Sequence, residues 1–296
     1  MNVNTTRNIP EGAYNIRENG QSIGRQSTEE IEIVPMEDGS GLNIYVKPGT
    51  KKKSLHIPVI ISQSGLSEVV YNNFHIGADC DVTIIAGCGI HNGGSADSRH
   101  DGIHSFYIGE NSRVKYVEKH YGMGDGNGER IMNPETNVEM AKNSYMEMET
   151  VQIKGVDSTI RKTHAKLEEG AKIVITERLM THGKQTAESY FDVTLDGEDS
   201  GANLISRAVA KENSYQKFVS RIIGNTACNG HSECDAIIMD HAKIEAVPEL
   251  TANSTEAALI HEAAIGKIAG EQITKLMTLG LTEADAEEKI VEGFLR

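Results

Sequence analysis

The segments Asn111-Ser112-Arg113-Val114-Lys115-Tyr116 and Asn143-Ser144-Tyr145-Met146-Glu147-Met148 decide the fold of this chain. Each begins with a turn pair that ends in Ser and continues as a strand in which apolar and polar residues alternate. The unit returns in looser form at later points, which are Asp157-Ser158, Gly170-Ala171, Gly201-Ala202, Asn213-Ser214, His231-Ser232 and His241-Ala242. Apart from two wider gaps, after Asn111 and after Gly170, successive starts lie roughly 10 to 18 residues apart, so two units would make a coil of about 26 to 30 residues.

This repeat predicts a parallel β-helix (a β-solenoid), because a strand–turn unit that cannot bury its apolar face alone must stack on copies of itself. A β-sandwich built from hairpins uses strands at similar spacing, so the pattern alone leaves both folds open. In either case the chain is mainly β. Alternating runs of strand length also precede the repeat, at Ile31–Ile33, Leu42–Val46, Leu55–Ile57 and Val82–Ile85.

Three regions follow from these patterns. Residues 1–30 are rich in Asn, Arg, Glu and Gly without a clear period, and they predict a flexible or loosely packed lead-in. Residues 31–264 carry the strand pattern and form the predicted β core. Residues 265–296 change to a helical period, which predicts a pair of short helices.

The helix pair is predicted from apolar spacing and from stop and start signals. One helical face would hold Ile268, Ala269, Gln272, Ile273, Leu276 and Met277. Gly280 stands where a helix ends, and Thr282 with Asp285 resembles a capping box that opens the second helix. Ala286, Ile290 and Phe294 then form a second stripe. The two apolar faces must pack on the rest of this chain or on a partner protein.

Charge and composition exclude several classes of protein. Lys and Arg number 29 against 43 Asp and Glu, for a net charge of −14, which argues against a nucleic-acid surface. The sequence contains no apolar run long enough to span a membrane and no signal-peptide pattern at Met1–Glu18, so we expect a cytoplasmic protein. Four cysteines are too few for a disulfide framework, and in a reducing compartment they would be thiols.

Thiols and imidazoles gather at two places in the sequence. Cys228, His231 and Cys234 follow one another at intervals of three residues and are ligand types for iron, zinc and iron–sulfur clusters. The alternative is a glycine turn before a strand, with Cys234 packed in the core as a small apolar side chain. The second group comprises Cys80, Cys88, His91, His100 and His104, and its histidines fit either ligation from a loop or plain solvent exposure.

His261 and Glu262 stand side by side where the strand pattern gives way to helix. In a strand, their side chains would point to opposite faces and could not bind one ion together, although each could act with residues of a neighbouring coil or another chain. The sequence has no phosphate-binding glycine loop, catalytic Ser-His-Asp order or His-Glu-x-x-His helix. A β-helix enzyme acting on polysaccharides would need aromatic platforms, and this chain has five Phe and no Trp. These observations favour a protein without catalytic activity of its own.

The C-terminal third resembles the SufB/SufD family of iron–sulfur cluster assembly proteins. The resemblance is firm over roughly Ser200–Arg296 and weaker back to about Asp79. It is carried by Cys234-Asp235-Ala236-Ile237-Ile238-Met239, Ala242–Leu250, His261-Glu262-Ala263-Ala264-Ile265-Gly266, Leu279–Ala286 and Gly293-Phe294; Val114–His120 also resembles the family. The resemblance implies a right-handed parallel β-helix, a SufC-like ABC ATPase docked on the C-terminal helices, and a homo- or heterodimer formed through the β-helix.

The resemblance also implies a transient iron–sulfur cluster, with His261 and Glu262 in the family's His-Glu-Ala segment. A cysteine expected in a turn near His241 is absent, since the turn reads Asp240-His241-Ala242-Lys243. The thiols that could supply cluster ligands are then Cys80, Cys88, Cys228 and Cys234, with His91, His104, His231 and His241 as further metal ligands. The sequence resembles a short member, of archaeal or anaerobic type, that serves both subunit roles. A SufD-like structural subunit that holds no cluster is the second interpretation.

Overall fold

The computed structural model describes residues 10–296, in which twenty β-strands precede two α-helices. The strands are β1 Ala13–Glu18, β2 Gln21–Gln26, β3 Ile31–Pro35, β4 Gly41–Val46, β5 Lys51–Ile61, β6 Ser67–Ile76, β7 Asp81–His91, β8 Ser98–Ile108, β9 Arg113–Met123, β10 Arg130–Met132, β11 Glu135–Met140, β12 Tyr145–Lys154, β13 Ser158–Leu167, β14 Lys172–Thr181, β15 Thr186–Leu195, β16 Gly201–Ala210, β17 Tyr215–Gly224, β18 Asn229–Ile238, β19 Lys243–Ala252 and β20 Ala258–Gly266. The helices are α1 Gly270–Thr278 and α2 Glu283–Phe294.

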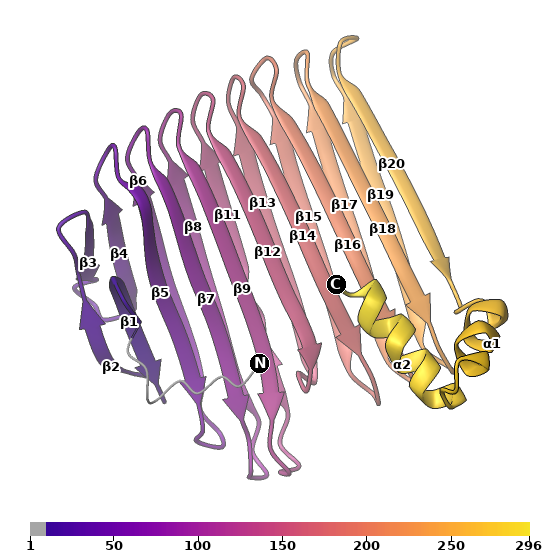
Figure 1. Ribbon diagram of the computed structural model, residues 1–296. Coiled ribbons are helices and arrows are strands. Elements are labelled where there is room, and N and C mark those ends of the chain that lie inside the picture. Colours follow the sequence, from indigo (N-terminus) through magenta and orange to yellow (C-terminus); the bar gives the residue numbers. More distant parts are fainter. Residues whose placement is uncertain (1–9) are drawn as a thin grey trace.

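The strands form a flattened parallel β-solenoid with two faces (Figure 1). Sheet A has the order β2-β1-β5-β7-β9-β12-β14-β16-β18-β20, and sheet B has the order β19-β17-β15-β13-β10-β8-β6-β4-β3, with β11 beside β8 and β13. Hydrogen-bonded side chains of neighbouring coils stand 27 to 32 residues apart in sequence, for example Arg130 with Asp157 and Lys115 with Glu147. The solenoid prediction is therefore confirmed, and the hairpin sandwich is excluded because the pairs beyond β4 and β5 are parallel.

The turn pairs of the sequence repeat fall at two corners of the solenoid. Those at Asn111, Asn143 and Gly170 precede strands of sheet A, and those at Asp157, Asn213 and His241 precede strands of sheet B. The turns before sheet A share one backbone conformation. Asp79, Asn111, Asn143 and Asp199 all have a positive φ, of 55° to 57°, which Asn and Asp tolerate better than other side chains. The next residue in each turn is small and buried in the corner: Cys80, Ser112, Ser144 and Ser200. The later repeats were placed in the wrong phase in two cases, since Gly201-Ala202 and His231-Ser232 lie inside β16 and β18 instead of at turns. Alternation alone does not distinguish a turn from a strand that contains small polar residues.

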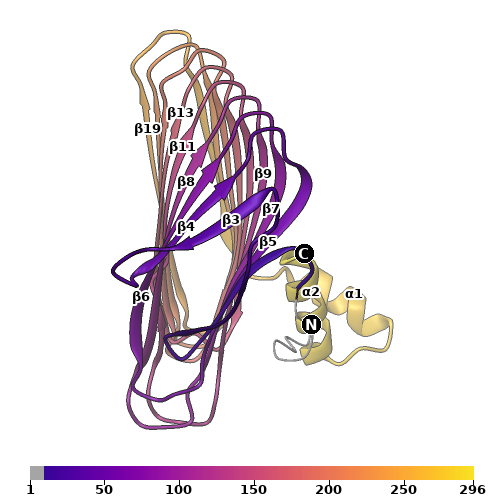
Figure 2. The ribbon, with the colours of Figure 1, turned by 90° about the vertical axis from the view of Figure 1, so that its left-hand side faces the viewer.

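The two sheets face each other across the solenoid (Figure 2). The core lies between them, because every second side chain of a strand points inward. Its long apolar cluster extends from Ala13 to Cys234 and is mostly aliphatic. Phe74 and Phe106 stack within it at a centroid distance of 4.4 Å. This interior is narrow, so each coil contributes a few side chains to continuous rows along the solenoid.

The predicted lead-in differs from the structure where it can be compared. Residues 1–9 lie outside the described residues. Residues 13–26 form the antiparallel β1–β2 hairpin, and β1 pairs in parallel with β5. Polar side chains obscure this strand pattern in the sequence. In the structure, Arg17 forms an ion pair with Glu68 (3.2 Å), and the exposed Arg25 donates to Asn15 (2.9 Å).

The C-terminal helix pair is confirmed. Thr282 Oγ1 accepts a hydrogen bond from the Asp285 amide (3.2 Å), and Gly280 adopts a φ of +96° between the helices. Helix α2 packs Val291 and Leu295 on Val209 and Ile237, on the outer face of sheet A. Helix α1 buries no residue. Within residues 10–296, neither helix is long and apolar enough to cross a membrane.

Candidate functional site

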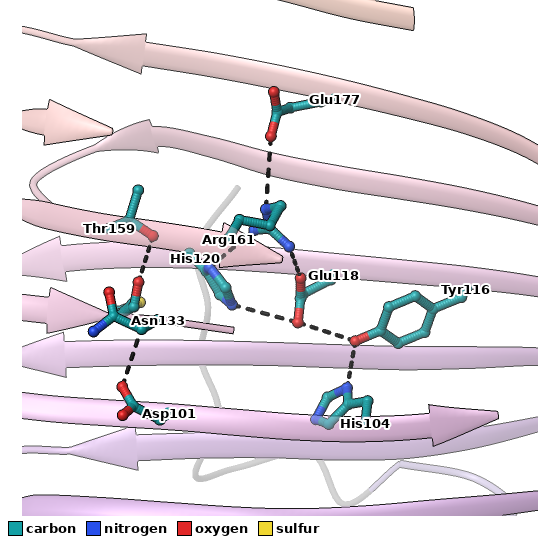
Figure 3. Close-up of polar contacts among 10 residues, drawn as sticks. Asp101, His104, Tyr116, Glu118, His120, Asn133, Thr159, Arg161 and Glu177 are labelled. Carbon is teal, nitrogen blue, oxygen red and sulfur yellow. Dashed lines mark hydrogen bonds and ion pairs between the residues drawn. The ribbon is translucent and has the colours of Figure 1, made fainter. Parts of the chain in front are cut away.

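A network of buried polar side chains crosses the interior of the solenoid (Figure 3). His104 of β8 contacts the hydroxyl of Tyr116 on β9 at 2.6 Å, and that hydroxyl donates to Glu118 Oε1 at 3.0 Å. Arg161 of β13 forms an ion pair with Glu118 and lies 3.6 Å from Glu177 Oε1 of β14. This polar network therefore joins both sheets across several coils.

The polar network continues toward the C-terminal end of the solenoid. Ser189 and Ser206 donate to the two oxygens of Glu177, at 2.6 and 3.1 Å. Ser206 pairs in register with Cys234 of β18. The inner row of sheet A thus contains Glu118, Thr150, Glu177, Ser206 and Cys234 on successive strands.

The charged groups of the polar network shift one another's pKa values. Burial alone would raise the pKa of Glu118, but the charge of Arg161, followed by His120, holds it well below its usual range. Burial outweighs the same arginine at Glu177 and raises the pKa of that carboxyl. Burial also lowers the pKa of His104 to about 4, so this imidazole is neutral near pH 7. Within this network, Arg161 is the cation that compensates the buried negative charge.

The sequence did not lead us to predict the polar network as a site, although its pattern of ionisable residues on an alternating strand was present. Val114–His120 alternates as Val, Tyr, Glu and His at the positions that now face inward. An ionisable side chain on the apolar side of an alternating strand indicates a buried polar network. His100 and His104 share the inner face for the same reason. The sequence predicted a loop or solvent exposure for them, but both lie on β8, where residues four apart share a face of the strand.

Three of the four candidate cysteines lie away from the C-terminal end or in a corner. Cys80 and Cys228 occupy the small-residue position of the turns, are 1% and 2% exposed, and the Cys80 thiol donates to the Lys47 carbonyl at 3.2 Å. Cys88 faces inward on β7, where burial and then Glu68 raise the pKa of its thiol. Strands β9, β12, β14 and β16 separate β7 from β18, so Cys88 lies roughly 24 Å from Cys234 at about 4.8 Å per strand.

The remaining histidines occupy contrasting surroundings. His104 is buried and hydrogen-bonded to Tyr116. His91 at the end of β7 and His241 in the turn before β19 are exposed. Their surroundings provide no reason to assign a ligand role to either.

The last coil brings Cys234 and His261 to the same inner face. Ser232 and Cys234 of β18 pair in register with His261 and Ala263 of β20, so all four side chains point into the solenoid. Cys234 is 0% exposed, and burial, followed by Glu177, raises the pKa of its thiol to about 12. His261 Nδ1 is buried and has no hydrogen-bond partner among residues 10–296.

The outer face of the same coil holds His231 and Glu262. Nε2 of His231 lies 3.7 Å from Oε2 of Glu262, and Nδ1 of His231 lies 2.9 Å from Oδ1 of Asn203. His261 and Glu262 point to opposite sides of β20, as their adjacent positions in a strand predict. The residues described here contain no group of three or more His, Cys, Asp or Glu side chains already arranged to hold a metal ion.

The fold is that of a β-solenoid protein, and four ligand-type residues lie on its last two strands of sheet A, namely Cys234 and His261 on the inner face and His231 and Glu262 on the outer face. The chain belongs to the SufBD core family: residues 60–294 match the family described as SUF system FeS cluster assembly, SufBD core domain.

Curated relatives agree with this assignment. An iron–sulfur cluster assembly SufBD family protein of Methanocaldococcus jannaschii is 28% identical over 263 residues, which cover 88% of this chain and 82% of the relative. Relatives bearing the same family name are 29% identical over 264 residues in Methanothermobacter thermautotrophicus and 28% identical over 280 residues in Archaeoglobus fulgidus. These matches cover 86% and 92% of this chain, and 62% and 73% of the respective relatives.

Proposed function

We propose that this protein is a non-enzymatic scaffold of a SUF-type assembly system, and that a nascent iron–sulfur cluster is bound at the inner face of its last coil. Cys234 and His261 are the ligands best placed for this role. The observation that carries the proposal is the buried, unpartnered Nδ1 of His261 beside the row of Ser232 and Cys234. A buried polar atom without a partner is costly, and a ligand at this position would offset that cost.

Access to this site is through the open end of the solenoid. Strands β19 and β20 are the outer strands of their sheets, and Leu250 and Ile265 on their inner faces are 38% and 39% exposed. The other end is closed by the antiparallel β1–β2 and β3–β4 pairs. An uncapped apolar end with two free strand edges favours pairing with a second SufB/SufD-type subunit, either another copy or a related chain.

Energy for assembly would come from a SufC-like ABC ATPase docked on the helix pair. Helix α1 has no buried residue, and Met277 and Leu279 at its C-terminal end are 45% and 74% exposed. Exposed apolar side chains on an amphipathic helix are typical of a docking surface. The complex would be cytoplasmic, in keeping with its free thiols.

Anaerobic reconstitution with iron and sulfide tests the cluster site. We expect brown colour and visible absorbance with the unaltered protein, and their loss in Cys234→Ser. Cys80→Ser serves as the matched control, because Cys80 is equally buried but lies in a corner of the other half of the solenoid. A chromophore that survives in Cys234→Ser, or that is lost equally in both variants, would contradict the assignment.

A SufD-like structural role is the second candidate, and a specific observation favours it. The Cys234 thiol is fully buried with a pKa of about 12, and metals bind the thiolate. If the last coil never opens, the protein remains structural. The two roles separate on the same experiment, since a structural subunit stays colourless after reconstitution yet still co-purifies with the ATPase.

The docking assignment has its own test. A chain that ends at Gly266 loses both helices but keeps every strand. We expect this truncated protein to fold and to lose co-purification with the ATPase. An intact complex after truncation would place the contact elsewhere.

A further inference from the structure

We propose that a groove along one corner of sheet B binds an extended, arginine-bearing segment of a partner protein. The groove has a volume of about 780 Å³ and follows the ends of the neighbouring strands β4, β6, β8, β11 and β13 (Figure 1). Cys234 and His261 lie on sheet A, so this proposal does not depend on the cluster site.

Three stacked rings line the groove. Tyr45, His75 and Tyr107 stand in register on β4, β6 and β8. Their ring centroids are 4.8 and 5.0 Å apart, and the interplanar angles are 14° and 10°. Tyr45 and Tyr107 are 42% and 41% exposed. Because the rings stack along the groove, they present their edges to it, and a ring face is left over at each end of the row.

The row of rings ends at a carboxylate. Glu139 of β11 pairs in register with Tyr107, so it takes the place of a fourth ring. One face of Tyr107 stacks on His75, and its second face is therefore directed to Glu139. Glu168 lines the same end of the groove. Both glutamates are exposed, and neither forms an ion pair with a Lys or Arg of residues 10–296.

A guanidinium group matches this end of the groove. A planar cation stacks on an aromatic face, and a guanidinium also binds a carboxylate through two parallel hydrogen bonds. Tyr107 and Glu139 are one strand spacing apart, about 4.8 Å, so one arginine side chain can reach both. An ammonium group has no plane to stack and no paired donors, so the geometry favours arginine over lysine.

The two lysines that line the groove leave this end negative. Lys166 Nζ lies 3.2 Å from Oδ2 of Asp196, which neutralises it. Lys47 directly follows β4, three strand spacings or about 14 Å from β11. The groove is therefore positive at the β4 end and negative at the Glu139 end, which orients a segment that carries a basic residue. The net charge of −14 favours the approach of a cationic partner.

The length and the surroundings of the groove suit a protein segment. Five strands span four spacings, about 19 Å, and an extended segment of six residues covers a similar distance at about 3.3 Å per residue. Beside the groove, the outward residues of β4, β6 and β8 are uncharged. They are Asn43, Tyr71, Asn73, Ile103 and Ser105. Surfaces that are rich in Tyr, Asn and Ser and poor in charge are typical of protein recognition.

Fluorescence anisotropy with the full-length protein and a labelled six-residue peptide of alternating glycine and arginine tests the proposal, at about 0.15 M salt to screen unspecific attraction. We expect Tyr107→Leu and Glu139→Gln each to weaken binding about three- to fivefold, through loss of stacking and of the ion pair respectively. A peptide in which lysine replaces arginine should bind at least about threefold more weakly.

The matched controls are Tyr71→Leu and Glu135→Gln. Tyr71 is as exposed as Tyr107, at 41%, and lies on the same outer face of sheet B but outside the groove. Glu135 lies on the same strand and face as Glu139 and also outside the groove. Both control variants should bind the arginine peptide like the unaltered protein.

Three results would overturn the proposal. The first is no binding of the arginine peptide. The second is equal affinity for the two peptides, or equal weakening in the control variants, since net charge alone would then attract the peptide. The third is a change from dimer to monomer in Tyr107→Leu during sedimentation, which would assign the groove to a second copy of the chain. Failure of the scaffold function looks different, because the protein would stay colourless on reconstitution yet still prefer the arginine peptide.

Discussion

At the scale of single residues, Arg161 decides how much charge the interior tolerates. Its side chain is 4% exposed and interacts with Glu118 and Glu177, which come from two strands of the opposite sheet. Each carboxylate depends on the same guanidinium, so the three residues act as one unit. Buried units of this kind stabilise little as a whole but are costly to break in part.

Arg161→Met should therefore destabilise the fold by about 3–5 kcal/mol, because it leaves two buried carboxyl groups without a counter-charge. The double variant Glu118→Leu with Arg161→Met should recover most of the loss, since only Glu177 remains and its pKa is already raised. Urea unfolding followed by circular dichroism measures both. A single variant that costs less than about 1 kcal/mol would mean that water already compensates these charges.

His104 makes the stability depend on pH. Burial lowers its pKa to about 4, from 6.5 in the unfolded chain, so the unfolded state takes up a proton first as the pH falls. Stability from His104 is complete above pH 6.5 and is lost progressively toward pH 4, by on the order of 3 kcal/mol in full. His104→Gln should flatten the decline in unfolding free energy between pH 7 and pH 4.5. Parallel curves for the two proteins would show that His104 is protonated in the folded state.

At the scale of elements, the corner turns and the C-terminal helices were predictable because their signals are local. Asn111 and Asn143 are residue types that indicate a positive φ, and Thr282 is a residue type that indicates the start of a helix. Neither inference requires the position of a distant residue. The site was less predictable. The inward direction of Cys234 and His261 follows from strand alternation, but their juxtaposition depends on the register between β18 and β20, which the sequence repeat placed in the wrong phase. The pairing of His231 with Glu262 needed the same register.

Helix α2 offers a test of local capping. Thr282 Oγ1 accepts from the Asp285 amide at 3.2 Å and donates to the Asp285 carboxylate at 2.6 Å. Thr282→Ala should destabilise the helix by about 1 kcal/mol and speed hydrogen exchange of the α2 amides. Thr278→Ala is the control, because Thr278 bonds only to the Lys275 carbonyl at the end of α1. Equal exchange rates in the two variants would contradict a capping role.

At the scale of the whole molecule, the two ends of the solenoid are unlike. Antiparallel pairs close the N-terminal end, and Pro35 ends its outer strand β3. Natural proteins protect free strand edges in such ways. The C-terminal end has two free strand edges, formed by the ten-residue β19 and the nine-residue β20. Exposed apolar side chains lie on both the inner and the outer faces of these strands. This asymmetry supports the proposed pairing of the C-terminal end with another subunit.

Leu250→Glu should test that asymmetry. The side chain lies on the inner face of β19 at the open end and is 38% exposed, so a charge there is tolerated in a single chain but not in an interface. We expect the unaltered protein to sediment as a dimer at micromolar concentration, or to pair with a related subunit, and the variant to sediment as a monomer with a similar melting temperature. The control is Val69→Glu on the outer face of β6 near the closed end, which is 48% exposed and should leave the association intact. If both variants associate as the unaltered protein does, the open coil is not the interface, and the C-terminal end of the solenoid remains uncovered in the assembly.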